Sequence, residues 1–244
     1  MSAAEQFGLS GTDYHLAGLF SPSGQRDRVW TALALYRGLD DIFYGCSEPE
    51  TARSSFAWWR EALANTSDPS RVGMRTGHPT IDQIRSLGAA GSVPDFQPLL
   101  DGLESRLDYQ IHDDQARQYS HSRSTMTPVA QWWLADSGSS EAVSDLTDLL
   151  ARWHLIRGLL KLQASIERGH IPIPRELLID ADLAAPDLVT HPTARTCSTI
   201  LSAVDALSGL DIPRAQSPAP VLSALLDGRV RALRKACSGT RPYS

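Results

Sequence analysis

The stretch LALYRGLDDIF at residues 33–43 joins a helical apolar pattern to two adjacent acids. Between Arg26 and Phe43 the apolar residues recur at spacings of three and four, which is the pattern of an amphipathic helix. Asp40 and Asp41 fall in an apolar part of this helix, where an acid is costly unless it faces water, a cation or a ligand cavity. Spacing alone favours an exposed edge near the helix end for both acids.

Helical patterns continue on both sides of this stretch. The sequence SEPE at residues 47–50 predicts a capping box, with proline in the first turn of a helix that carries FAWWREAL at residues 56–63. The longest and most apolar helix is expected from Val143 to Ile166, ending at Gly169. Further helices are expected at residues 78–88, 95–107, 113–135, 194–207 and 221–236, with Pro128 kinking or interrupting the third of these.

No segment alternates cleanly between apolar and polar residues with hairpin turns at its ends. The expected class is therefore all-α, with a single domain over residues 1–244. The tryptophans should pack in the core between helices, since large aromatic side chains contribute most when buried. This applies to Trp58, Trp59, Trp132, Trp133 and Trp153.

The composition excludes several classes of protein. The chain has 244 residues and a net charge of −5, with 23 Lys and Arg against 28 Asp and Glu. This balance argues against general nucleic-acid binding, which needs clustered basic residues. The longest apolar runs fall short of the ~20 residues of a membrane span, and no signal or transit peptide is visible. Three separated cysteines lack metal-ligand spacing, so we expect a cytoplasmic protein.

Common catalytic motifs are absent from the sequence. There is no P-loop, no dinucleotide-binding glycine pattern, no HExxH zinc motif and no GxSxG nucleophile elbow. His112 is the only histidine followed by adjacent acids, Asp113 and Asp114, and a solvated turn is favoured there over a metal site. No nucleophile stands out.

The order of several motifs resembles the squalene/phytoene synthase family, whose members have an all-α isoprenoid synthase fold. The resemblance covers about Tyr14 to Leu183 and includes the acidic pair on its helix. The motifs, in order, are RGLDD at residues 37–41, SEP at 47–49, WWREAL at 58–63, the helix at 96–107 and RGHIPIP at 168–174. Together they predict the isoprenoid synthase fold for this chain.

The resemblance also shows where this chain departs from active members. Those members carry two DxxxD elements on facing helices, which hold Mg²⁺ ions that bridge to a substrate diphosphate. Here Tyr44 stands four residues after Asp40, at the second acidic position of the first element. Arg157 and Lys161 stand at the two acidic positions of the second element. Arg106 replaces a further family aspartate. As cations, these three residues would repel Mg²⁺.

The chain therefore resembles a branch of the family in which the aspartates are lost. Mitochondrial members of that branch are regarded as assembly factors for respiratory complex I. The resemblance implies a protein without catalytic residues or a metal, which binds an isoprenoid-type lipid or a partner protein. The candidate ligand pocket comprises Arg37, Asp40, Asp41, Tyr44, Arg157, Lys161 and Arg168.

Several alternatives remain open from the sequence. Asp40, Asp41 and Asp108 could hold Mg²⁺ in an active but divergent head-to-head prenyltransferase, although surface charge is favoured for Asp108. Arg157 and Lys161 could bind a phosphate directly, together with Arg37, or reach out to water. The sequence also permits peripheral contact of the protein with a membrane surface. An open apolar cavity between Asp40 and Arg157 would favour lipid binding, and a closed one would favour a protein scaffold.

Overall fold

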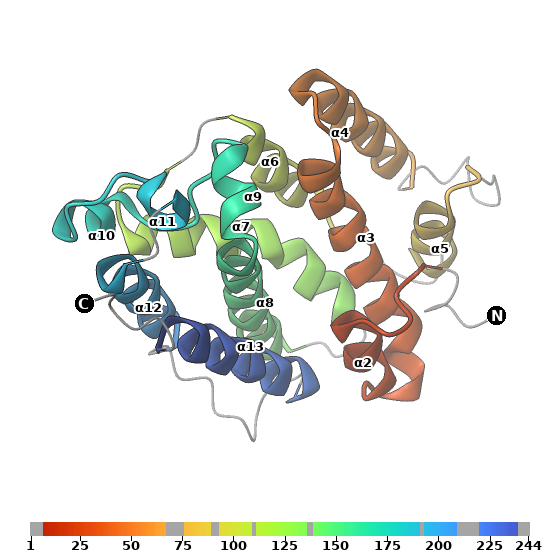
Figure 1. Ribbon diagram of the computed structural model, residues 1–244. Helices are drawn as coiled ribbons and strands as arrows, with labels where there is room; N and C mark the ends of the chain where they lie inside the picture. Colours follow the sequence, from red (N-terminus) through yellow and green to blue (C-terminus); the bar gives the residue numbers. More distant parts are fainter. Residues whose placement is uncertain are drawn as a thin grey trace.

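The computed structural model of the chain is an all-α bundle, as the sequence predicts (Figure 1). It describes residues 7–66, 76–88, 93–108, 111–135, 139–190, 193–208 and 220–238. Within these ranges every regular element is an α-helix or a short 3-10 helix, and none is a strand. The elements are α2 (Asp13–Leu19), η1 (Ser23–Gln25), α3 (Arg26–Gly45), α4 (Pro49–Ala64), α5 (Pro79–Gly88), α6 (Gln97–Glu104), η3 (Ser105–Leu107), α7 (Gln115–Trp133), α8 (Ser140–Leu160), α9 (Leu162–Glu167), α10 (Arg175–Asp180), α11 (Asp187–Thr190), α12 (Ala194–Ser208) and α13 (Pro220–Ser238).

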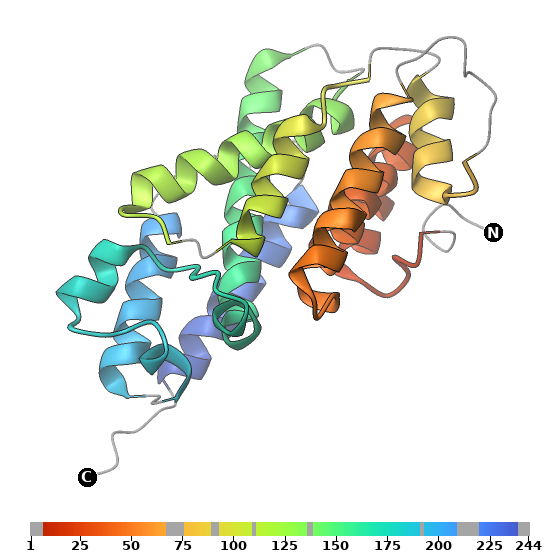
Figure 2. The same ribbon diagram turned by 90° about the horizontal axis from the view of Figure 1, so that it is seen from above.

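Helices α7 and α8 form the centre of the bundle, and α3 and α6 pack against α7. Figure 2 shows the N-terminal helices α3 to α5 at one end of this centre and α10 to α12 at the other. Helix α13 runs between the two ends and packs against α12, α8 and α2. Trp132 and Trp133 are fully buried near the end of α7, and Trp153 is buried on α8. These three positions confirm the expected core packing of the tryptophans.

The WW pair of α4 is divided between core and surface. Trp59 is 6% exposed, but Trp58 is 45% exposed, so the expectation of core packing was wrong for Trp58. Consecutive helical residues point about 100° apart, and the core covers only one side of α4. The Trp58 ring lies over His78, with centroids 5.4 Å apart.

Three local predictions need correction. Of the two expectations for Pro128, interruption was wrong: α7 runs from Gln115 to Trp133 through this buried proline, because packing at the centre of the bundle outweighs one lost hydrogen bond. The long helix predicted at residues 143–166 is divided at Lys161, where the backbone leaves the helical region at φ −108° and ψ 30°. Helix α4 begins at Pro49 with Glu48 before it, and no side chain caps its first turn, so the capping box at Ser47 was wrong.

The end of the divided helix agrees with its prediction. Gly169 follows Glu167 and Arg168 with a φ of +79°, a conformation that favours glycine over other residues. The following segment, Ile171 to Pro174, is not helical. This turn brings His170 and Pro172 back against the centre of the bundle, where both line the cavity described below.

Helices α6 and α7 approach closely at Gly102, and we predict that Gly102→Ala destabilises the protein. A Cβ atom at this position would lie 2.0 Å from Oγ1 and 2.8 Å from Cβ of buried Thr125. Overpacking of this kind costs about 1–3 kcal/mol, measurable by urea denaturation. Gly45→Ala is the matched control, since nothing lies within 4 Å of its Cβ position on α3. Equal stability of the two variants would contradict the close approach.

None of the described helices combines the length and the apolar character that crossing a membrane requires.

Candidate functional site

Helix α3 carries the first acidic element, and the side chains of this element project from two sides of the helix. Asp40 and Tyr44 are one turn apart and face the centre of the bundle, where Asp40 is 1% exposed. Asp41 points away, with 53% of its side chain exposed, and pairs with Arg37 at 3.4 Å. The expectation of an exposed helix edge was therefore right for Asp41 and wrong for Asp40.

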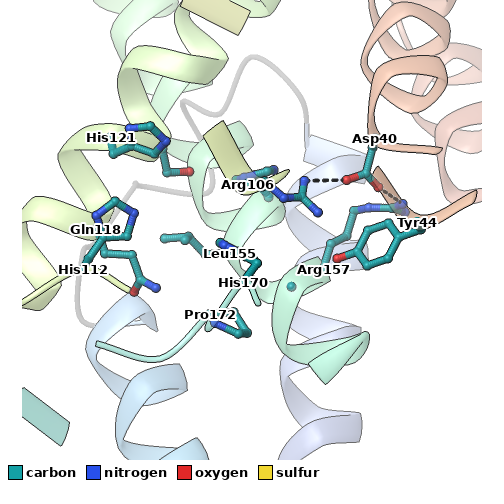
Figure 3. Close-up of a pocket in the computed structure, with 13 residues that line it drawn as sticks. Asp40, Tyr44, Arg106, His112, Gln118, His121, Leu155, Arg157, His170 and Pro172 are labelled. Atoms are coloured by element: carbon teal, nitrogen blue, oxygen red, sulfur yellow. Dashed lines mark hydrogen bonds and ion pairs between the residues drawn. The ribbon is translucent and has the colours of Figure 1, made fainter. Parts of the chain in front are cut away.

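The buried carboxylate of Asp40 is shared by two guanidinium groups (Figure 3). Arg106 Nη1 lies 2.8 Å from Oδ1, and Arg157 Nη2 lies 2.6 Å from Oδ2. Lys161 Nζ is 3.9 Å from the same Oδ2. Burial alone would raise the pKa of the Asp40 carboxyl, but the two arginines overcome this effect and hold the pKa well below its usual range. Asp40 is ionised and fully paired.

Aromatic rings surround the same cations. The guanidinium of Arg106 lies 4.0 Å from the ring centroid of Phe43, and Lys161 Nζ lies 3.7 Å from that of Tyr44. Arg157 is 5.5 Å from the Tyr14 ring. At these distances the ring faces attract the positive charges and help to hold them in the interior. The alternative in which Arg157 reaches out to water was therefore wrong, because an acid and an aromatic ring hold its head group inside.

Tyr44 occupies the position of the second acid in the first element. Its hydroxyl lies 3.1 Å from Ser165 Oγ, and burial raises the pKa of the phenol. A neutral phenol that is already hydrogen-bonded is a poor ligand for Mg²⁺, which prefers carboxylates and water.

A small chamber lies beside the Asp40 pairs, between α3, η3, α7, α8 and the turn after α9. Its volume is about 20 Å³, which is room for a single water-sized occupant. Figure 3 shows Asp40 and Tyr44 at one side, Arg106 in the middle and two histidines at the far side. The lining residues are Asp40, Tyr44, Arg106, His112, Gln118, His121, Ser122, His154, Leu155, Arg157, Gly158, His170 and Pro172. Side chains therefore fill most of the space between Asp40 and Arg157, and little free volume remains there.

Four histidines form the far part of the chamber. His112 and His121 have ring centroids 5.0 Å apart, and Tyr36 Oη lies 2.9 Å from His154 Nδ1. Burial lowers the pKa of all four, to about 3 for His154, and nearby Arg106 lowers those of His154 and His170 further. The histidines are therefore neutral at physiological pH. Sequence reasoning considered only His112, as part of a solvated turn, and missed the other three because they come from separate elements and show no helical spacing.

Four of the seven predicted pocket residues do not line the chamber: Lys161 lies at its edge, 3.9 Å from Asp40, and Arg37, Asp41 and Arg168 lie outside it. Arg37 donates from Nη1 to the carbonyl of Gly8 at 2.6 Å, and with Asp41 it lines a separate groove of about 290 Å³ beside Trp59. Arg168 donates to the backbone carbonyls of Tyr44, at 2.9 Å, and of Cys46. The single pocket expected from the sequence is corrected accordingly: residues 37 and 41 line the groove on one side of α3, whereas residues 40 and 44 line the chamber on the adjacent side.

Two other acidic positions lie at the surface. Asp108 pairs with Arg53 at 2.8 Å and is well exposed, which confirms its interpretation as surface charge. Asp113 pairs with Arg117 and Arg175 at 3.0 and 3.1 Å, and Asp114 caps the start of α7. These acids are engaged in the turn before α7 and do not line the chamber.

The residues present do not fit Mg²⁺. Both oxygens of Asp40 are engaged by arginines, and the two positions of the second acidic element carry Arg157 and Lys161. Among the described residues no three His, Cys, Asp or Glu side chains come together in a way that could hold a metal ion. The charged side chains of the site form ion pairs with one another.

Comparisons with known proteins agree with the architecture. The sequence profile of the family described as squalene/phytoene synthase matches residues 9–210. The crystal structure of squalene synthase HpnC from Alicyclobacillus acidocaldarius is similar to this chain with a TM-score of 0.69 and 17% identity. The similarity covers 98% of this chain and 94% of that one, and at this identity it concerns the fold alone. No curated protein matches the chain in sequence.

Proposed function

Since the chain belongs to the squalene/phytoene synthase family, we propose that it is a member without catalytic activity, which binds a partner protein through the retained fold. Two properties are therefore proposed: the protein does not catalyse the family reaction, and it binds another protein. We also propose a cytoplasmic location, for which the composition and the cysteine pattern are the support.

The observation that carries the loss of activity is the pairing of Asp40 with Arg106 and Arg157. For Mg²⁺ to bind Asp40, at least one buried guanidinium would have to leave its carboxylate. Breaking a buried ion pair typically costs about 3–5 kcal/mol, because the remaining charge has no partner. The arginines cannot lose their protons to escape this cost. The ion pairs therefore oppose the metal binding on which family chemistry depends.

The size of the chamber supports a protein partner over an isoprenoid lipid. A prenyl diphosphate is many times larger than a water molecule, whereas the chamber holds about 20 Å³. The aromatic faces of Phe43, Tyr44 and Tyr14 are already covered by the chain's own cations. A lipid would have to displace these side chains together. Binding at the outer surface requires no such rearrangement.

Incubation of the purified protein with farnesyl or geranylgeranyl diphosphate and Mg²⁺ tests the proposal. We expect no release of diphosphate above the rate without protein, with an active squalene synthase as positive control. Mg²⁺-dependent release would overturn the proposal and favour the divergent prenyltransferase.

A binding assay in EDTA separates the two kinds of partner. We expect farnesyl diphosphate not to bind, since the chamber is far too small for it. Binding in EDTA that is weakened by Arg157→Ala would show that Arg157 contacts the phosphate directly. That result would replace the protein partner with a phosphorylated isoprenoid ligand.

A further inference from the structure

The chamber beside Asp40 carries more positive than negative charge. Its lining contains two guanidiniums, those of Arg106 and Arg157, against the one carboxylate of Asp40. The four histidines add no charge at physiological pH, because burial lowers the pKa of each. Lys161 adds a further cation at the edge, 3.9 Å from Asp40. The lining therefore has at least one positive charge in excess.

This excess is not removed by the protein itself. Arginine keeps its proton under all ordinary conditions, and a buried charge without a counter-charge is costly. Two other acids have partners of their own: Asp41 pairs with Arg37 on the adjacent side of α3, and Asp113 pairs with Arg117 and Arg175 at the surface. Among the described residues that line the chamber, Asp40 is the only acid, so a further negative charge would come from a bound ion.

Buried nitrogen atoms in the lining also lack a partner. Arg106 Nε and Arg157 Nε donate to no acceptor among the described residues, and His170 Nδ1 has no hydrogen-bond partner among them. Arg106 is 3% exposed and His170 is 9% exposed, so bulk water does not satisfy them. The neighbouring space of about 20 Å³ exceeds the roughly 10–15 Å³ that one water-sized occupant needs.

We propose that the chamber binds a halide-sized monoanion, such as chloride, between Arg106 and His170, with buried Gln118 beside it. One negative charge balances the excess, the guanidinium N–H groups without partners point to an acceptor, and His170 can donate to it in the tautomer protonated at Nδ1. Prenyl diphosphates are far too large for this space. The inference deepens the proposed function and rests on it in one respect: Asp40 must stay paired with its arginines and free of metal.

Bromide is the probe, because it replaces chloride and scatters X-rays anomalously. Crystals grown in sodium bromide with EDTA should show an anomalous peak between Arg106 and His170. In solution with EDTA, the melting temperature should rise with bromide concentration and should not rise with gluconate at equal ionic strength. An empty chamber, or equal effects of bromide and gluconate, would overturn the proposal.

Two variants make the result specific to the chamber. Arg106→Gln should abolish the bromide effect, whereas Arg53→Gln should keep it, because Arg53 pairs with an acid at the surface. The anomalous peak in crystals of the unaltered protein decides the question even if Arg106→Gln does not fold. An unchanged response in Arg106→Gln, or loss of the response in Arg53→Gln, would contradict the proposal.

These measurements need neither Mg²⁺ nor a prenyl substrate. Diphosphate release in the enzyme assay would overturn the proposed function. It would not by itself account for a bromide peak in the chamber. Failure of bromide to bind would overturn only the anion site.

Discussion

Replacing Asp40 with alanine is expected to lower the free energy of unfolding by about 3–5 kcal/mol. The substitution leaves Arg106 and Arg157 buried side by side without the carboxylate that pairs them at 2.8 and 2.6 Å. Neither arginine can become neutral, so the like charges repel each other in the interior. Urea denaturation at pH 7, followed by circular dichroism, measures the loss.

The adjacent acid provides the matched control. Asp41 is on the same helix and also pairs with an arginine, but half of its side chain is exposed and the pair distance is 3.4 Å. Exposed pairs of this kind contribute less than about 1 kcal/mol, so Asp41→Ala should change stability little. Similar losses for the two variants would contradict the view that burial of the Asp40 pairs determines their effect.

The same pair of acids shows what could be predicted from the sequence and what could not. The apolar spacing of residues 26–43 predicted helix α3 correctly, because helix formation depends on neighbours three and four positions away. The burial of Asp40 depends on Arg106 and Arg157, which lie 66 and 117 positions further along the chain. Local spacing contains no information on such pairs.

The family resemblance supplied part of what spacing could not. It marked residues 106, 157 and 161 as positions where acids are expected, and the structure brings all three basic residues to Asp40 or its edge. It also grouped Arg37 and Arg168 with them, yet these side chains bind backbone carbonyls outside the chamber. A motif identifies a helix and its region, whereas the direction of each side chain depends on packing.

The break at Lys161 was missed for a related reason. The apolar pattern continues without interruption through Leu160 and Leu162, so nothing in the spacing indicates that α8 ends and α9 begins. In the structure Lys161 lies over the Tyr44 ring at this point, a contact between residues far apart in sequence. Tertiary contacts of this kind override a local helical preference.

A second large effect is expected from pH, because the buried histidines must stay neutral in the folded protein. Burial lowers the pKa of His154 from 6.5 to about 3, whereas in the unfolded chain this histidine takes up a proton near pH 6.5. Between these two values the unfolded state binds one more proton than the folded state. The free energy of unfolding should therefore fall by up to about 1.4 kcal/mol per pH unit as the pH decreases from 6.5 toward 4, and His170, whose pKa burial also lowers, contributes with the same sign.

Asp40 does not account for this acid sensitivity, since its pKa lies well below its usual range and its carboxylate stays ionised throughout the window. Urea denaturation at pH 7, 6, 5 and 4 gives the slope, and His154→Gln should reduce it by up to one proton, while a glutamine can still form a hydrogen bond with Tyr36 Oη. In the folded protein, the His154 ring signals in NMR spectra should not shift between pH 7 and 5. Titration of these signals near pH 6.5 would contradict the buried neutral imidazole and the chamber charges derived from it.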